Sequence, residues 1–342
     1  MRIKRLDRST VCEFESSIRE RLGRDRNTMW GYYAHPGLVD FHWSRLLASC
    51  ESDSVDVWNC VDGSGPVLLF GLGKHESHTQ VFKTMVGRVG PLYRLSPDMD
   101  LVQNALKRCA AKGKSLGLQI LTLRVPASGH FLNYCLSTLG WSHVGTSAKL
   151  AIDRDQWAKC YVDTDFSTIY SSCLSGDEGA VGLREAGPSD AHQLAGIISR
   201  AHRHSHFFND PHLPEAGRNS LFPVWIERSV NGMMDLVLVA EKEGDILGFA
   251  SCLVSRGLQE FVGHEVGALD FIAVDPAAQG QGIGKRLLNA VFAWLFQRVP
   301  VIELRTMVDN TAALTLYSRL GMVPVGSDHH YHCWLSMGRR TG

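Results

Sequence analysis

The sequence has no excess of charge of either sign, no long apolar run and no C-x-x-C pair. Its 35 Lys and Arg balance 35 Asp and Glu over 342 residues, which argues against binding nucleic acid or a membrane surface by bulk electrostatics. No window approaches the ~18 uninterrupted apolar residues of a membrane-spanning helix. The nine cysteines are odd in number and scattered, which disfavours a disulfide framework or a zinc ribbon and indicates free thiols.

The basic start, residues 1–8, has no apolar stretch behind it, so we expect no secretory signal and a cytoplasmic location. What is present, 44% hydrophobic and 20% charged residues, predicts a folded chain. Its length, at about 150 residues per domain, predicts two domains. The polar segment 163–180, rich in Gly, Ser and Asp, is the expected linker. Residues 1–162 and 181–342 are then the two domains.

The second domain alternates strand and helix patterns, which indicates a mixed α/β fold. The helix beginning near residue 283 has apolar residues at helical spacing, and Asp309 is expected to cap the helix that ends at Leu320. A final strand pair, with residues 330–337 as its clearest member, closes the fold. The expected strands are 181–186, 235–241, 246–255, 268–274 and 301–306, and the expected helices are 190–202, 283–298 and 309–320.

A shift of 181 residues aligns the first half with the second without gaps. Five landmarks share this register over some eighty residues, which predicts a duplicated unit, although two α/β domains with similar turns remain the alternative. The landmark pairs are Gly63 with Gly244, Leu106 with Leu287, 121–124 with 302–305, 139–140 with 320–321, and 144–145 with 325–326.

A glycine-rich loop follows the strand 268–274 and opens the next helix. Its glycines, Gly280, Gly282 and Gly284, let successive N–H groups point into one concavity. The positive end of the dipole of the following helix lies at the same place. Such a site suits a pyrophosphate. The spacing is not the G-x-G-x-x-G of a dinucleotide site, and Lys285 lacks the Ser or Thr that follows it in a Walker loop. The pyrophosphate of coenzyme A is the remaining interpretation.

The segment Gln279-Gly-Gln-Gly-Ile-Gly284 resembles the Q/R-x-x-G-x-G/A motif of the GNAT acetyltransferases. The flanking residues 273–276 and 309–322 fit the same family, and the resemblance extends over about 181–337. Residues 201–211 and 221–232 further resemble the TDP-fucosamine acetyltransferase branch, in which a degenerate half precedes the working one.

The resemblance implies an α/β fold with a mixed sheet, made of two GNAT-like acyl-CoA N-acyltransferase domains in tandem, the N-terminal one degenerate. It implies direct acetyl transfer from acetyl-CoA, without a metal, to a primary amine on an amino sugar, nucleotide-linked or not. An amino acid, a polyamine, a protein amine or a non-catalytic acyl-CoA sensor are the alternatives. The implied cofactor-binding residues are Ile272, Ala273, Val274, Gln279, Gly280, Gln281, Gly282, Ile283, Gly284, Lys285, Asn310 and Ala313.

The resemblance also places the acid that protonates the departing thiolate at Tyr317, with packing in the core as the alternative. The base is open. Asp270 lies at even spacing from Ile272 and Val274 and is expected to point the same way, and a carboxylate on an apolar strand needs a partner or a role. Glu265 and His264, at the entrance of the strand, are its rivals, and a water chain is a further possibility.

On the acceptor side, a histidine-rich segment follows the first helix of the second domain. We expect His204, His206, Phe207 and Asn209 to bind the amine substrate, as a small molecule rather than a nucleic acid or a membrane. A metal site is disfavoured, because no carboxylate or cysteine stands at fixed spacing. An exposed final strand leaves a homodimer open.

In the repeat register the glycine loop falls on residues 98–103, which contain two aspartates and no glycine. Tyr317 falls on Leu136, and Asn310 on Gly129. The first copy is therefore expected not to bind coenzyme A.

Overall fold

The computed structural model describes residues 1–24, 35, 37–63, 65–159, 165–175, 181–201 and 204–335. The chain forms two compact units. Unit 1 comprises residues 1–147, 209–214 and 326–342, and unit 2 comprises residues 148–208 and 215–325. The predicted linker 163–180 contains a helix, α8 (Phe166–Leu174), that belongs to unit 2.

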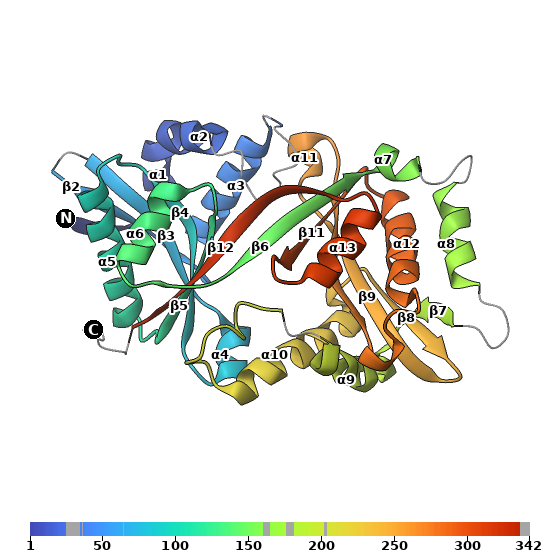
Figure 1. Ribbon diagram of the computed structural model, residues 1–342. Helices are drawn as coiled ribbons and strands as arrows, with labels where there is room; N and C mark the ends of the chain where they lie inside the picture. The colour runs from blue at the N-terminus through green and yellow to red at the C-terminus, as the bar shows by residue number, and fades with distance from the viewer. Residues whose placement is uncertain are drawn as a thin grey trace. The chain divides into compact units, whose positions relative to one another are not determined.

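Unit 1 is a mixed sheet covered by helices (Figure 1). Its strands follow the order β1-β2-β3-β4-β5-β12, antiparallel except for the parallel pair β4–β5. Its elements are β1 (Arg2–Leu6), α1 (Arg8–Val11), η1 (Cys12–Phe14), α2 (Glu15–Arg24), α3 (Gly37–Glu51), β2 (Asp56–Asp62), β3 (Gly65–Lys74), α4 (Glu76–Phe82), β4 (Val86–Arg94), α5 (Met99–Ser115), β5 (Ile120–Pro126), α6 (His130–Thr138), the start of β6 (Ser142–Asp153) and the end of β12 (Val323–Trp334).

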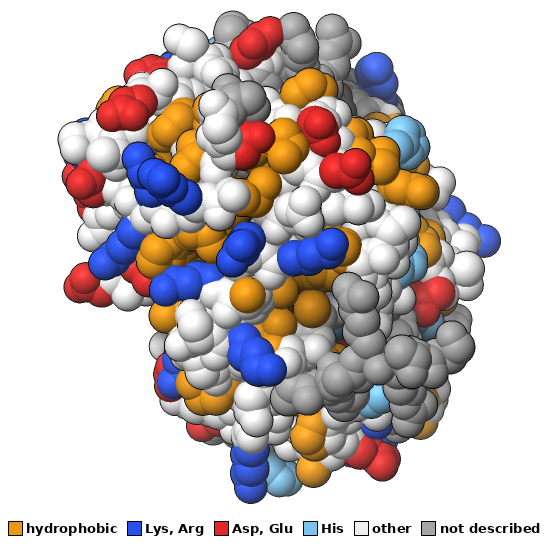
Figure 2. All heavy atoms as spheres, turned by 90° about the vertical axis from the view of Figure 1, so that its left-hand side faces the viewer, with side chains coloured by type: hydrophobic (Ala, Val, Ile, Leu, Met, Phe, Trp, Pro, Cys, Tyr) orange, Lys and Arg blue, Asp and Glu red, His pale blue; other side chains and the backbone are white. Residues whose placement is uncertain are grey.

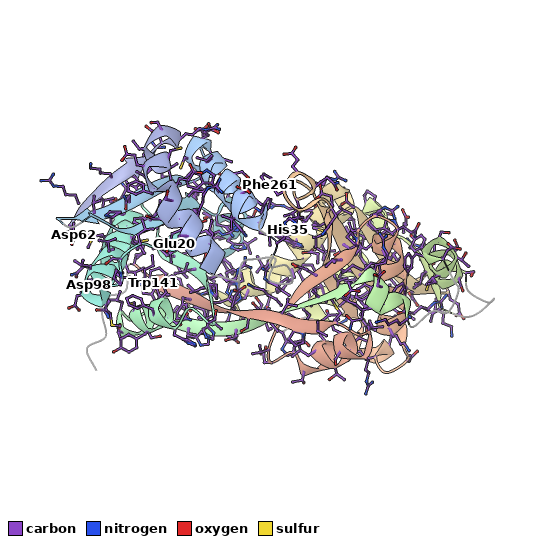
Figure 3. All side chains as sticks on the ribbon, turned by 90° about the horizontal axis from the view of Figure 1, so that it is seen from above. Glu20, His35, Asp62, Asp98, Trp141 and Phe261 are labelled. Atoms are coloured by element: carbon purple, nitrogen blue, oxygen red, sulfur yellow. The ribbon has the colours of Figure 1, made fainter. Side chains whose placement is uncertain are left out.

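Two apolar cores hold unit 1 together. One contains Leu106 and Leu121 and includes Trp141, labelled in Figure 3, whereas the other joins Trp43 and Leu46 of α3 to the first strands. On the face seen in Figure 2, Lys and Arg side chains lie among hydrophobic ones. Lys112 of α5 lies 4.2 Å from the ring centre of Trp58, which is a cation–π contact.

In unit 2 the strands follow the order β6-β11-β10-β9-β8-β7, in which β10 and β11 are parallel and the pairs from β10 to β7 are antiparallel. Its chief core packs Leu287, Leu288, Val291 and Leu295 of α12 against the sheet, all fully buried, as their helical spacing predicts. Its elements are the end of β6, α7 (Arg154–Ala158), α8, β7 (Gly182–Glu185), η2 (Pro188–Asp190), α9 (Ala191–Ala201), α10 (Glu215–Arg228), η3 (Ser229–Met233), β8 (Leu236–Lys242), β9 (Asp245–Ser255), α11 (Gln259–Val262), β10 (Val266–Val274), η4 (Pro276–Ala278), α12 (Ile283–Phe296), β11 (Val301–Met307), α13 (Thr311–Arg319) and the start of β12.

The duplication predicted from the sequence is confirmed by the element bounds. At the same shift of 181 residues, β5, α6 and β6 have the limits of β11, α13 and β12. The copies have exchanged their last strands, however. Strand β12 of the second copy pairs with β5 of the first from Asp328 to Trp334, and β6 of the first copy neighbours β11 of the second. Each compact unit thus contains a strand from the other copy.

The predicted strands and helices of the second copy are confirmed, with two corrections. Asn310, not Asp309, caps α13, because its side chain accepts a hydrogen bond from the N–H of Ala313. The final strand pair is a single described strand, β12, whose partner β5 comes from the first copy. The domain limits 1–162 and 181–342 describe copies in the sequence, which differ from the compact units because of the exchange.

The described cysteines are free thiols, and Cys60, Cys109, Cys135 and Cys252 are buried. Within the described residues, no helix is long and apolar enough to span a membrane.

Candidate active site

Strands β10 and β11 of unit 2 pair over a short distance only. Their parallel register consists of Gly267 with Ile302 and Ala268 with Glu303. On its other edge β10 pairs with β9 from Val266 to Val274. Beyond Ala268, β10 is not paired with β11 in the described chain, and the backbone groups on that edge are available to a ligand.

The loop between β10 and α12 is shaped by its glycines. Gly280 and Gly282 have φ angles of +78° and +79°, which residues with a side chain adopt only with strain. Gly282 is also the N-cap of α12, and no side chain caps that end of the helix. The first N–H groups of a 14-residue helix are thus left for another acceptor.

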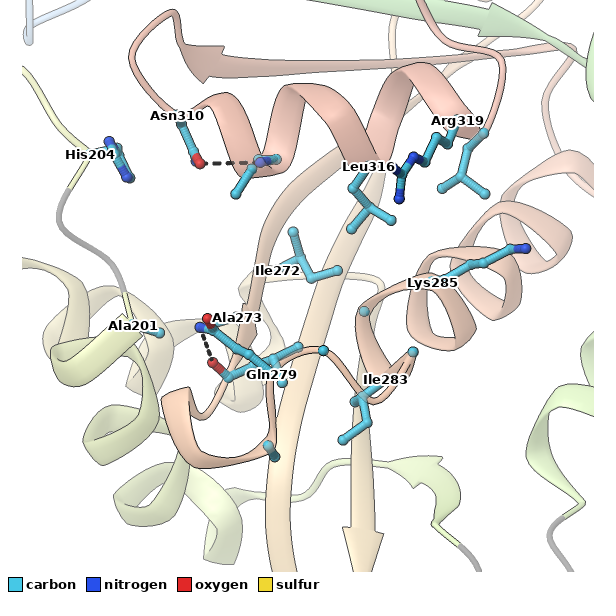
Figure 4. Close-up of a pocket in the computed structure, with 18 residues that line it drawn as sticks. Ala201, His204, Ile272, Ala273, Gln279, Ile283, Lys285, Asn310, Leu316 and Arg319 are labelled. Atoms are coloured by element: carbon cyan, nitrogen blue, oxygen red, sulfur yellow. Dashed lines mark hydrogen bonds between the residues drawn. The ribbon is translucent and has the colours of Figure 1, made fainter.

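A cavity of about 640 Å³ lies between this loop and α13 (Figure 4). It is lined by every predicted cofactor-binding residue except Gln281, and by His204 of the predicted substrate-binding set. Lys285 and Arg319 lie at one end and His204 and Asn310 at the other, with Ile272 between them. The described lining contains no carboxylate, so the cavity favours an anionic ligand.

The acidic residue at the start of the loop, Asp275, is paired with an arginine. Asp275 caps η4 by accepting a hydrogen bond of 3.0 Å from the N–H of Ala277. Its other oxygen pairs with the guanidinium of Arg200 at 2.5 Å. The Arg200 hydrogen bond, aided by that of Ala277, lowers the pKa of Asp275. Arg200 therefore offsets a charge that would repel an anion in the cavity.

Asn310 and His204, at the end of the cavity opposite Lys285, are held in place by polar contacts. The Oδ1 of Asn310 accepts from Ala313 N–H at 3.3 Å, and its Nδ2 donates to the Oγ1 of Thr306 at 3.2 Å. His204 Nδ1 lies 3.5 Å from a carboxylate oxygen of Asp309. On the loop side, the Nε2 of Gln279 donates to the carbonyl of Val274 at 3.1 Å, as Figure 4 shows.

Tyr317 of α13 belongs to the main core of unit 2 and is 5% exposed. Burial raises the pKa of its hydroxyl well above the ordinary value, so it remains protonated. No hydrogen bond to the hydroxyl is found in the described part of the chain. Its neighbours in the sequence, Leu316 and Leu320, line the cavity, whereas Tyr317 is not among the lining residues.

Asp270 lies at a β-bulge, where the pairing of β10 with β9 shifts between Leu269 and Phe271. The expectation that it points the same way as Ile272 and Val274 is wrong, because the extra residue reverses the alternation. Its carboxylate instead accepts a hydrogen bond of 2.8 Å from the indole N–H of Trp225, on the face covered by α9 and α10. Burial raises the pKa of Asp270 to about 6, although the Trp225 hydrogen bond opposes the shift.

Glu265 is engaged elsewhere. Its two oxygens accept hydrogen bonds from the backbone N–H groups of Gly257 and Leu258, at 3.1 and 3.3 Å. The carboxylate thus holds the turn after β9 and does not line the cavity.

The predicted substrate-binding residues are not brought together as a set. Phe207 is buried, and the ring of His206 packs on it with centres 4.0 Å apart. Asn209 belongs to unit 1, where it donates to the carbonyl of Val144 at 2.9 Å. His202, the first histidine of the same histidine-rich segment, lies outside the described residues. The described side chains contain no group of three His, Cys, Asp or Glu that would hold a metal ion.

In the first copy, the aspartate that aligns with Gln279 occupies the helix start itself. The carboxylate of Asp98, labelled in Figure 3, accepts a hydrogen bond of 3.0 Å from Leu101 N–H and caps α5. A negative side chain therefore takes the position that an anion would need.

Arg319 and Leu316 of the lining, and the buried Glu303 of β11, were not predicted from the sequence. The spacing of Ala312, Leu316, Arg319 and Leu320 along one helix face could have indicated the lining residues, given that Asn310 and Ala313 were already assigned to the cofactor. No comparable signal marks Glu303.

The mixed sheet, the glycine loop at the start of α12 and the strand opening define an acetyltransferase of the GNAT class, and the profile of the acetyltransferase (GNAT) family matches residues 201–322. A mycothiol acetyltransferase of a Nocardioides species is 41% identical over 311 residues, covering 85% of this chain and 98% of that protein. The chain belongs to the GNAT acetyltransferase family.

A second relative is the spore coat polysaccharide biosynthesis protein SpsD of Bacillus subtilis, 28% identical over 148 residues, or 43% of this chain and 48% of that protein. With two further relatives the alignment covers 33% and 55% of their length. Among solved structures, a tandem GNAT protein from the clavulanic acid biosynthesis pathway has a TM-score of 0.59 at 13% identity, covering 99% of each chain. That similarity supports the tandem fold.

Proposed function

We propose that the chain transfers the acetyl group of acetyl-CoA directly to a primary amine on an amino sugar. The observation that carries the proposal is the cavity, which combines an uncapped helix end, two cations, no described carboxylate and the free edge of β10. A pyrophosphate suits the helix end and Lys285, and an extended amide-containing arm suits the strand edge.

The residues present fit coenzyme A. Gly284 faces Leu316, where an added Cβ would lie 3.4 Å from a methyl group, so the loop stays close to α13. The bound cosubstrate supplies an activated thioester; the chain's own residues bind it, orient it and exclude water. We assign the role of general acid to Tyr317. On the side where the acceptor binds, we assign a supporting role to Asp270 rather than to Glu265, whose two oxygens accept hydrogen bonds from a backbone turn.

The amino-sugar acceptor rests on the sequence resemblance and on SpsD, whose name refers to polysaccharide biosynthesis. A second candidate is the acceptor of the mycothiol acetyltransferases, favoured by the 41% identity over nearly all of the Nocardioides protein. We further propose that the first copy does not bind coenzyme A, that the partner is a small molecule and that the enzyme is cytoplasmic.

The test measures thiol release from acetyl-CoA with a panel of amino sugars, the mycothiol precursor amine, amino acids and polyamines. We expect turnover with an amino sugar, and in Tyr317→Phe a loss of ~10²-fold in kcat with coenzyme A affinity unchanged. Tyr170→Phe is the matched control, since its hydroxyl contacts Glu185 at 3.4 Å, away from the cavity. If coenzyme A binds but no amine gives release, the chain is an acyl-CoA sensor instead.

A further inference from the structure

Glu303 is a buried carboxylate without a described hydrogen-bond donor. It is 9% exposed, and its Oε1 has no partner in the described chain. Its neighbours Ile302 and Leu304 belong to the core under α12. Because side chains alternate along a strand, Glu303 faces the opposite side of the sheet. A buried carboxylate oxygen without a partner is free to accept a hydrogen bond from a ligand or a water molecule.

The position of Glu303 is defined by the strand opening. It forms the last register pair of β10 with β11, opposite Ala268. Asp270 follows two residues along β10, on the face of Trp225. The cavity, in contrast, lies toward α12 and α13. The two carboxylates thus lie where β10 and β11 are last paired before they separate. They are on the face of the sheet opposite the cavity, from which an acceptor would approach a thioester held there.

The charges around Glu303 are mixed. Burial raises the pKa of Glu303 to about 7, and the positive charges of Arg305 and Lys149 oppose that shift. Lys149 of β6 is 4% exposed, and the Oε1 of Glu303 has no hydrogen-bond partner in the described chain. Asp270, the other carboxyl on this face, is held by Trp225. A carboxyl of this kind exchanges protons near neutral pH, as a base for an ammonium group requires.

We infer that Glu303 binds the ammonium group of the acceptor and takes its proton, an assignment that rests on the proposed acetyl transfer. The nitrogen gives one proton to Glu303 and forms the C–N bond to the acetyl carbon as the C–S bond breaks. The electron pair leaves on sulfur, which takes the proton of the Tyr317 hydroxyl. The second nitrogen proton returns through water to Tyr317, and Glu303 releases its proton to solvent, so that one proton is released per acetyl group.

The first experiment uses no ligand. In full-length protein labelled with ¹³C at the glutamate carboxyl carbons, one resonance should titrate near pH 7 and should vanish in Glu303→Gln. Titration of every glutamate below pH 5 would overturn the assignment. This measurement does not depend on the activity, and it remains informative on the wild-type protein if the variant folds poorly.

The second experiment compares rates between pH 6 and 9. Glu303→Gln should lose ~10²-fold in kcat at pH 7 and recover as the amine deprotonates in solution, with coenzyme A affinity unchanged. Glu303→Asp should retain part of the rate, and the exposed Glu227→Gln should behave as wild type. A Glu303→Gln rate within threefold of wild type refutes the inference alone. If wild-type protein acetylates no amine, the proposed function fails, and the inference fails with it.

Discussion

Gly282 offers a direct test of the loop because its role depends on backbone geometry alone. Its φ of +79° is a left-handed conformation, and a Cβ added there would meet nothing within 4 Å. Gly282→Ala therefore introduces strain without a clash, at a cost of about 1–2 kcal/mol. A β-branched side chain in Gly282→Val costs more, whereas Gly282→Asn costs less, because asparagine tolerates this region.

The free loop can relax out of the strained conformation, but a bound anion requires it. The strain then appears in the binding free energy, and about 1–2 kcal/mol corresponds to a 5- to 30-fold weaker affinity. We expect isothermal titration with coenzyme A to give the affinity order wild type, Asn, Ala, Val. The matched control is Gly244→Ala, at a hairpin turn with φ of +91° and equal space, which should lower stability and leave the affinity unchanged.

An affinity in Gly282→Val equal to that of wild type would show that the ligand does not use this loop. If Gly244→Ala weakens binding as much as Gly282→Ala, the loss comes from general destabilisation, and the argument from the loop fails.

Three further outcomes are expected. Arg200→Met removes the ion pair of Asp275 and should weaken coenzyme A binding about threefold, and more at low salt. The double variant that adds Asp275→Asn should recover the affinity. If the double variant binds as weakly as Arg200→Met, Arg200 does not act by neutralising Asp275. Asp270 has a folded pKa of about 6, above its ordinary value, so its contribution to stability is lost as pH rises from about 4 to 6. Asp270→Asn should therefore stabilise the chain to denaturant at pH 7.5, by at most ~3 kcal/mol, and much less at pH 4; equal effects at both pH values exclude a raised pKa. Phe296→Ala removes a fully buried ring packed on Trp157 and Phe292 and should cost about 3–5 kcal/mol of unfolding free energy, where a loss under 1 kcal/mol means that the site collapses around the change.

The parts of the fold predicted from the sequence are those with a strong local pattern. Helix α12 has an apolar face at helical spacing, β10 is a mostly apolar run and β11 contains apolar residues in a short strand pattern, so their types follow from the local pattern. The cofactor-binding residues lie in a continuous loop and one helix start, which local sequence defines. Helix α10 was missed because Pro223 lies inside it, and α8 because its polar composition is typical of a linker.

The remaining features depend on partners that a local pattern does not encode. Alternation along β6 and β12 is the same whichever strand pairs with them, so the exchange between copies left no sequence signal. The bulge at Asp270 adds one residue without changing the composition, and it reverses the side chain's direction. Glu303 stands in a polar position of an alternating strand, where the usual outcome is exposure; only the packing around it makes it buried.

Because the copies exchange strands, the first copy has a structural role that does not require a ligand. If the chain were cut between the copies, the second copy would lose β6, the neighbour of β11, and the first would lose β12, the partner of β5. Each fragment would then expose an unpaired sheet edge, so we expect each to be less stable alone than in the intact chain. A gene for this protein cannot discard the copy without the glycine loop, because the copy that has the loop borrows part of its sheet from it.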